Sequence, residues 1–174
     1  MDNLAFLEDV RARGGVMMKV TPHSRAIGMQ LVDVAPNTAL IMAPYAPELV
    51  GNPDTGVIHG GVITSLLDNA SGLSVSCHMG ERKSMATLDL RIDYMHPAAP
   101  GEAVYARAEC YKVTNNVAFV RGIAYQLKDG AHNVDDPIAT CVATFMMTDG
   151  PIPDLDSMMA LAAANGFPVN KEEA

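Results

Sequence analysis

The stretch His59-Gly-Gly-Val-Ile-Thr-Ser-Leu-Leu-Asp-Asn-Ala-Ser-Gly-Leu-Ser-Val-Ser-Cys-His-Met79 decides the fold. Its apolar residues recur with the period of an α-helix and glycines stand near both ends, so the spacing predicts a helix from Gly60 to Met79. We assign its apolar face to Val62, Ile63, Leu66, Leu67, Ala70, Leu73, Ser74 and Cys77. The opposite face then holds Gly61, Thr64, Asp68, Ser71, Val75 and Met79.

The segments on either side of this helix alternate with the two-residue period of β-strands. Residues 27–34 and 38–43 predict a hairpin, and the proline- and glycine-rich residues 44–58 predict an irregular loop. Four further strands are expected at 84–95, 102–114, 117–128 and 137–147. In the first of these strands, we assign one face to Thr87, Asp89, Arg91 and Asp93, and the apolar face to Ala86, Leu88, Leu90, Ile92 and Tyr94.

Together these elements predict one α+β domain over residues 1–174. An antiparallel sheet is expected to bury its apolar face on one long central helix and to curve around it, with the core at about 25–148. A short N-terminal helix is expected at 2–13, ending at Gly14-Gly15, and a short C-terminal helix at about 154–165.

The composition excludes several classes of function. Of the 174 residues, 49% are hydrophobic and 18% charged, and the net charge of −8 with no run of Lys or Arg gives no reason to expect binding to nucleic acid or to an anionic membrane. The chain shows neither a signal peptide at its start nor an apolar membrane span, so we expect a cytoplasmic location. The three cysteines, which are far apart in apolar surroundings, are expected to be buried thiols.

Asp68 is the one ionised side chain of the central helix, although a solvated helix face normally carries several charges. The small residues near it are Gly61, Thr64, Ser71 and Gly72. Something is expected to pack against them, and a second copy of the chain is the simplest candidate. Asp68 would then lie partly desolvated at a subunit boundary, where a carboxylate is a better base. Two alternatives stay open: a solvated surface carboxylate, or a hydrogen bond across the dimer contact.

Two glycines, Gly60 and Gly61, stand at the start of the helix. Bare backbone N–H groups and the helix dipole favour developing negative charge there, which is an oxyanion site in outline. A tight turn of the chain is the alternative role for two glycines. Asp68 lies about 12 Å farther along the helix axis, at 1.5 Å per residue. At this separation, the N–H donors and the carboxylate of one chain cannot both act on the same carbonyl group. The donors and the carboxylate are therefore expected to come from different subunits.

The run from His59 to Asn69, preceded by Asn52 and followed by Met85-Ala-Thr-Leu-Asp-Leu-Arg-Ile-Asp-Tyr-Met-His-Pro97, resembles the hotdog-fold thioesterases of the PaaI type. The resemblance covers about residues 25–148. It implies a hotdog fold, dimers whose sheets join edge to edge and often pair again into tetramers, and hydrolysis of acyl-CoA thioesters without a metal or an organic cofactor.

The resemblance also implies roles for individual residues. Asp68 corresponds to the general base or nucleophile, and Gly60 to the N–H donor that polarises the thioester carbonyl, with Gly61 as a neighbouring donor. His59 would shape the loop and the helix start, where it contacts the substrate site. Thr87 corresponds to a polar residue that positions water.

Three further residues complete the expected site. Asn52 would hold substrate or water, although it stands seven residues before the histidine where the family commonly has six. CoA carries about four negative charges through its phosphates. Arg82 and Lys83, just after the helix, are therefore expected to contact a CoA phosphate, with a solvated face as the alternative.

Two other functions on the same fold are weighed against hydrolysis. One is a non-catalytic module that binds acyl-CoA or an acyl carrier, and the other is an enoyl-CoA hydratase, whose Asp/His pair the sequence does not assemble. The Gly-x-Ser-x-Gly motif of the α/β-hydrolases is absent. The acyl group, aryl or aliphatic, is left open.

Overall fold

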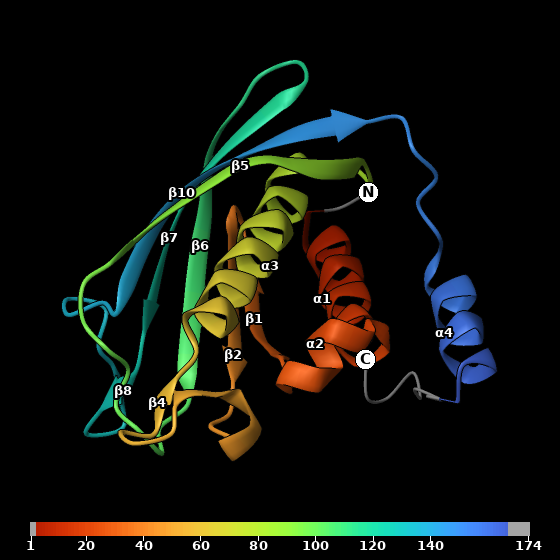
Figure 1. Cartoon of the computed structure of the whole chain (residues 1–174). Coiled ribbons are helices and arrows are strands. Elements are labelled where there is room, and N and C mark those ends of the chain that lie inside the picture. Colours follow the sequence, from red (N-terminus) through yellow and green to blue (C-terminus); the bar gives the residue numbers. More distant parts are fainter. Residues whose placement is uncertain (1–2, 167–174) are drawn as a thin grey trace.

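Helix α3 (Gly60–Met79) is the axis around which the sheet curves in the computed structural model, which describes residues 3–166 (Figure 1). The sheet has six strands in the order β1-β2-β6-β7-β10-β5, and all neighbouring pairs are antiparallel. The strands are β1 (Gln30–Ala35), β2 (Thr38–Ala43), β5 (Ser84–Tyr94), β6 (Val104–Val113), β7 (Val117–Tyr125) and β10 (Ala139–Thr148). The predicted α+β architecture is confirmed, while residues 1–2 and 167–174 of the expected domain lie outside the described part.

The predicted irregular loop at 44–58 contains more structure than expected. A 3₁₀ turn η1 (Pro47–Leu49) leads into a small hairpin of β3 (Val50–Asn52) and β4 (Val57–Ile58). A Cβ atom on Gly51 would lie 2.7 Å from the Cα of His59, so only glycine lets this hairpin approach the start of α3. A second small hairpin is formed by β8 (Leu127–Lys128) and β9 (Ala131–His132).

Helix α1 (Asn3–Val20) continues seven residues beyond the predicted end. Gly14 does not end the helix, because it packs closely against β1 and α3: a Cβ atom there would be 3.2 Å from Leu31 and 3.3 Å from Leu73. A short helix α2 (Pro22–Ile27), which was not predicted, follows, and α4 (Leu155–Ala164) confirms the C-terminal helix. Within residues 3–166, no helix combines the length and apolarity that crossing a bilayer requires.

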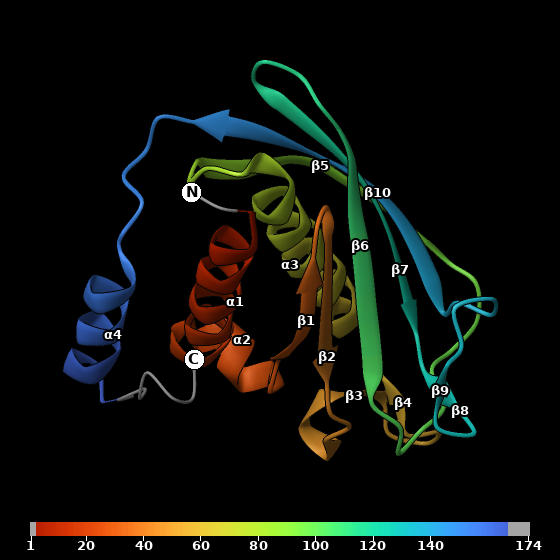
Figure 2. The ribbon, with the colours of Figure 1, turned by 180° about the vertical axis from the view of Figure 1, so that it is seen from behind.

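The inner face of the sheet is lined by small side chains. Its buried alanines are Ala39, Ala43, Ala106, Ala108, Ala118, Ala124, Ala139 and Ala143. From α3, Leu66 and Leu67 are fully buried in the same core. Large helix side chains thus fill the room that small strand residues leave, and the helix can lie close to the sheet. Seen from behind, β2, β6 and β7 cover one side of α3 (Figure 2). Helix α1 lies on another side of α3, between α3 and α4.

Ser71 and Val75 are fully buried within the chain, which corrects their assignment to the face opposite the apolar one. The Oγ atom of Ser71 lies 3.9 Å from Sγ of Cys141 on β10. A Cβ atom on Gly72 would lie 3.5 Å from the ring of Phe145, also on β10. The chain's own sheet therefore covers part of the small face that was expected to meet a second copy.

We expect the three cysteines to resist alkylation in the folded protein. All three are buried free thiols. Burial raises the pKa of Cys77 to about 12 and that of Cys110 to about 11, and it also raises the pKa of Cys141. Because the thiolate is the reactive form, iodoacetamide at pH 8 should label no site in the native protein and all three in urea. Mass spectrometry counts the labels, and rapid labelling of the native protein would contradict the burial.

Candidate active site

Asp68 and Thr87, two of the predicted site residues, meet in the structure. The hydroxyl of Thr87 donates a hydrogen bond of 3.0 Å to Oδ1 of Asp68. Asp68 is half-buried on the flank of α3, and Thr87 comes from β5 at the edge of the sheet. A hydrogen bond from a fixed strand holds the carboxylate in one orientation, as a reacting group requires.

A β-bulge at Leu88 turns Thr87 toward the helix. Phe145 of β10 lies opposite Thr87, whereas the preceding Thr144 lies opposite Asp89, so Leu88 is the extra residue on β5. Residues that lie opposite each other in an antiparallel pair point to the same face of the sheet. Thr87 therefore points to the inner face, as its buried partner Phe145 does, whereas Leu88 is 52% exposed. The predicted alternation, with Leu88 on the apolar face and Thr87 on the other, is wrong at this point.

The start of α3 has one bare donor where two were predicted. His59 caps the helix, because Nδ1 of its ring accepts the N–H of Gly61 at 2.9 Å. The N–H of Gly61 is therefore occupied. Within the described residues, the N–H of Gly60 has no acceptor, as is common in the first turn of a helix. Gly60 is thus the donor that is free to meet a ligand.

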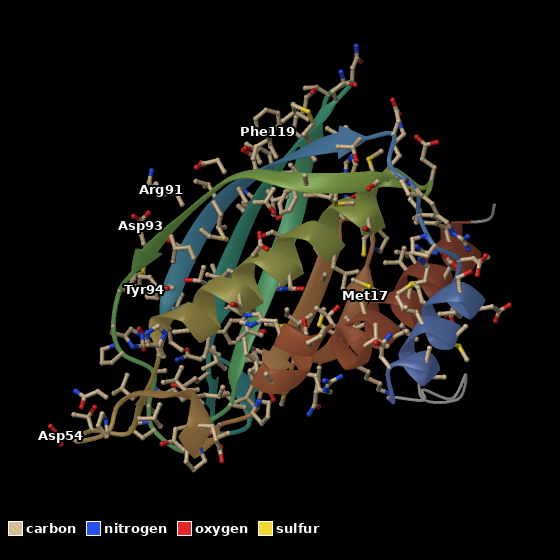
Figure 3. The ribbon with its side chains drawn as sticks, turned by 45° about the vertical axis from the view of Figure 1, so that its right-hand side comes forward. Met17, Asp54, Arg91, Asp93, Tyr94 and Phe119 are labelled. Carbon is tan, nitrogen blue, oxygen red and sulfur yellow. The ribbon has the colours of Figure 1, made fainter. Side chains whose placement is uncertain are left out.

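Tyr94 covers this helix start and was missed from the sequence. Its hydroxyl donates to the carbonyl of Gly60 at 2.8 Å and lies 2.9 Å from the hydroxyl of Thr64. Figure 3 shows Tyr94 at one end of β5, with Arg91 and Asp93 beside it. A tyrosine at the end of an edge strand carries no sequence signal for such a contact, which depends on the crossing of β5 and α3.

Asn52 is engaged inside its own turn. Its Oδ1 atom accepts the N–H of Asp54 at 3.0 Å, and its side chain is exposed. In the described chain, no hydrogen bond joins Asn52 to Asp68. The predicted residues therefore form two clusters within one chain: Asp68 belongs to the flank of α3, whereas Asn52 and His59 belong to its start.

Arg82 and Lys83, the residues expected at the CoA phosphates, are each paired with an acid. Arg82 donates two hydrogen bonds, of 2.6 and 3.0 Å, to the carboxylate of Asp9. Nζ of Lys83 lies 2.9 Å from Oε1 of Glu81. These partners offset the positive charge, and contact with CoA stays a prediction.

An apolar cavity of about 490 Å³ lies beside Asp68. On α3 its lining runs from Asp68 to Met79, and α1 contributes Met17 and Met18 from the other side. Figure 3 shows Met17 beside α1, on the side of this helix that faces α3. The predicted helix end at residue 13 left Met17 outside α1, although the apolar Val16, Met17 and Met18 favour a continued helix. The volume is typical of a small-molecule site.

Metal ligands are not grouped in residues 3–166: no three His, Cys, Asp or Glu side chains are arranged to hold an ion. The groups that can act on a ligand beside the cavity are thus the carboxylate of Asp68 and the hydroxyl of Thr87. The free N–H of Gly60 lies at the helix start. A carboxylate can accept a proton or attack a carbonyl, and a bare N–H can stabilise an oxyanion.

The cap at His59 predicts a stability effect that depends on the hydrogen-bond acceptor. Changing His59→Ala should lower the free energy of unfolding by about 1 kcal/mol, whereas His59→Asn, which keeps a capping acceptor, should lose less than about 0.5 kcal/mol. Urea unfolding followed by circular dichroism measures both. Equal losses in the two variants would show that the cap contributes nothing.

Three comparisons place the chain among known proteins. Residues 55–131 match the family model described as the thioesterase superfamily. Medium/long-chain acyl-CoA thioesterase YigI of Escherichia coli K12 is 34% identical over 140 residues, which cover 72% of this chain and 85% of that protein. A crystal structure of a Pseudomonas aeruginosa protein has a TM-score of 0.68 at 41% identity and covers 82% of this chain and 99% of its own.

The PaaI protein of Escherichia coli has a TM-score of 0.70 and covers 85% of this chain and 99% of its own. At 14% identity, this likeness shows the fold alone. It confirms the predicted hotdog fold, and the resemblance to PaaI-type proteins is confirmed with it. By its family match and by its extended similarity to YigI, this chain belongs to the thioesterase superfamily.

Proposed function

We propose that this chain hydrolyses acyl-CoA thioesters to the free acid and CoA. The observation that carries the proposal is the Asp68 carboxylate, which Thr87 orients at the wall of an apolar cavity. The similarity to a relative named as a medium/long-chain acyl-CoA thioesterase supports the same activity. The charged group can act on the thioester while the cavity holds the acyl group.

In the proposed reaction, Asp68 acts as a general base. Water attacks the thioester carbonyl carbon and gives its proton to Asp68, the carbon–sulfur bond then breaks, and the proton passes to the departing CoA thiolate. The N–H of Gly60 of the partner subunit stabilises the oxyanion between these steps. A thiolate is a good leaving group, so a base and an oxyanion donor, each worth about 3–4 kcal/mol, suffice without a metal or cofactor.

Direct attack by the carboxylate is the second route open to Asp68. It would form an anhydride between Asp68 and the acyl group, which water then hydrolyses. Turnover in water labelled with oxygen-18 distinguishes the routes, because only the anhydride route can leave the label in Asp68.

The second subunit is proposed to pair along β5. This strand lies at the edge of the sheet, has 11 residues, and exposes Leu88 and Tyr94 by about half of their surfaces. Long exposed edges are normally paired or protected. A two-fold axis sets β5 antiparallel to its copy, so the Tyr94 end of one strand meets the Thr87 end of the other.

This pairing would complete the site. Tyr94 contacts Gly60 and Thr87 contacts Asp68 within each chain. An antiparallel pair of β5 strands therefore brings the free N–H of one subunit toward the carboxylate of the other, which the separation along α3 prevents within one chain. We propose a dimer as the catalytic unit and its further pairing into a tetramer.

The two alternative functions have less support. A module that only binds an acyl group needs no oriented carboxylate. A hydratase would use a histidine beside the acid, and in the described residues the side-chain donor to Asp68 is Thr87. Hydrolysis remains the function that uses each group of the site.

The Asp68→Asn variant should lose activity by a factor of about 10²–10⁴, because the amide cannot accept the proton from water. Release of free thiol from acyl-CoA measures the rate. Asp135→Asn, a matched change at an exposed position away from the site, should stay within twofold of the wild-type rate. Unchanged hydrolysis by folded Asp68→Asn would refute the proposed base.

Replacing Gly60 tests the oxyanion donor and its subunit of origin. Gly60→Pro removes the N–H at a first helical position that accepts proline, since the backbone of His59 is extended, with ψ of 132°. It also adds a Cβ atom 3.3 Å from the hydroxyl of Tyr94, and Gly60→Ala adds the same atom, so alanine is the control for this contact. The rate should fall about 10²–10³-fold, whereas Gly60→Ala, which keeps the N–H, should lose far less.

Mixing Gly60→Pro with Asp68→Asn subunits then tests the shared site. After reversible unfolding and reassembly of equal amounts, half of the dimers are mixed and each has one intact site, so about a quarter of the wild-type activity should return. A site built within one chain predicts no recovery. Light scattering on the same sample reports the mass of the assembly.

A further inference from the structure

The apolar cavity runs along α3 in one direction from the proposed catalytic carboxylate. Its lining on this helix begins at Asp68 and Asn69 and continues through Gly72, Leu73 and Ser76 to Met79. Asp68 and Met79 are eleven steps apart along the helix, and at 1.5 Å a step this wall is about 16 Å long. The wall is apolar beyond its first turn except for the hydroxyl of Ser76, which lies 3.5 Å from the carbonyl of Gly72.

Helix α1 covers the cavity from end to end, antiparallel to α3. Its Gly14 lies against Leu73 in the middle of the wall, and its Asp9 is bound by Arg82 just after the end of α3. Figure 1 shows the two helices running in opposite directions, so the later residues of α1, Met17 and Met18, lie toward Asp68. Methionine side chains adapt to the shape of a flexible apolar ligand.

The segment between β10 and α4 borders the cavity on another side, which stays partly open to solvent. Pro151, Ile152 and Pro153 line the cavity, and the guanidinium of Arg13 on α1 donates to the carbonyl of Pro153 at 2.8 Å. Met158 of α4 also lines it and packs against α1 through Val16. This roof is built outside residues 55–131, the part that matches the family model.

The far end of the cavity is charged. Asp9, Arg82, Lys83 and Glu81 border it, and they are joined in two ion pairs. An alkyl chain that reached this end would have to displace water from charged groups without replacing its hydrogen bonds, which is unfavourable. The ion pairs thus mark where an apolar ligand must end.

We propose that this cavity is an acyl-chain ruler: it binds an unbranched alkyl chain whose thioester lies at Asp68 and whose end lies before the Asp9–Arg82 pair. The inference rests on the proposed function and adds the class of its substrate. Extended chains advance about 1.2 Å per bond, as the span of the polypeptide backbone shows, so 16 Å accommodates about 10–13 carbons. This arrangement replaces the expected contact of Arg82 and Lys83 with a CoA phosphate: both residues border the end of the alkyl chain, and the CoA part of the substrate extends from Asp68 toward the partner subunit.

Ser76 marks a point two helical turns beyond Asp68, and its replacement tests the ruler. Helical side chains lean toward the N-terminus, so methionine in Ser76→Met would fill the cavity about one turn from Asp68. Ser76→Ala removes the hydroxyl without filling the cavity. Ala160→Met adds the same side chain at an exposed position of α4 that does not line the cavity.

Hydrolysis is measured with straight-chain acyl-CoA esters of 4 to 16 carbons. The wild type, Ser76→Ala and Ala160→Met should prefer about 10–13 carbons, while Ser76→Met should prefer about 4–6. The kcat/KM of Ser76→Met for dodecanoyl-CoA should fall about 100-fold, because several methylene groups of this substrate are no longer buried. Ala160→Met should hydrolyse both dodecanoyl-CoA and butanoyl-CoA within twofold of the wild-type rate. An unchanged chain-length profile in folded Ser76→Met would overturn the ruler.

A binding measurement separates the ruler from the thioesterase proposal. Neutral n-alkanols of 4 to 16 carbons compete with the dye Nile red, so neither CoA nor catalysis is involved. Dodecanol should displace the dye from the wild type at a concentration at least tenfold lower than from Ser76→Met. If this holds while the wild type hydrolyses no CoA ester, the hydrolysis proposal fails and the alkyl site stands. Equal displacement in both proteins would overturn the ruler whatever the activity.

Discussion

The contact on which the rest of the structure depends is the packing of large helix side chains against small strand residues. Leu66 and Leu67 of α3 are fully buried against a sheet lined by alanines such as Ala106 and Ala124. Because close-packed interiors tolerate little shift, this contact fixes both the position and the rotation of α3. The same rotation decides which flank of α3 carries Asp68, so core packing sets the orientation of this carboxylate and the hydrogen bond from Thr87 refines it.

The elements with a strong period were predictable, because burial on one side imposes that period on the sequence. The central helix and the strands of the large sheet appear close to their expected places. The face of Thr87 was not predictable from alternation, since a bulge adds one residue and reverses the faces on one side of it. The resemblance had placed Thr87 at the site while the alternation had placed it on the other face, and the bulge at Leu88 resolves that conflict.

The features that the local sequence patterns did not predict depend on contacts between residues far apart in the sequence. Gly14-Gly15 is a reasonable helix end on propensity alone, but packing against Leu31 and Leu73 favours a continuous helix. The hydroxyl of Tyr94 and the carbonyl of Gly60 meet only because β5 crosses the start of α3. Similarly, the occupied N–H of Gly61 depends on the ring position of His59. The sequence thus named Asp68, Thr87 and Gly60 as candidates, whereas the contact of Tyr94 and the availability of each N–H group depend on the fold.

The roof over the cavity joins parts of the chain that are made at very different times. Arg13 emerges from the ribosome long before Pro153, whose carbonyl it binds across 140 residues. The central helix and most of the sheet can associate before the last strand and α4 exist, but Val16 has no cover until Met158 and Ala162 arrive. Domains of this kind expose apolar surface while they are incomplete. The docking of α4 on α1 should therefore be the closing event of folding.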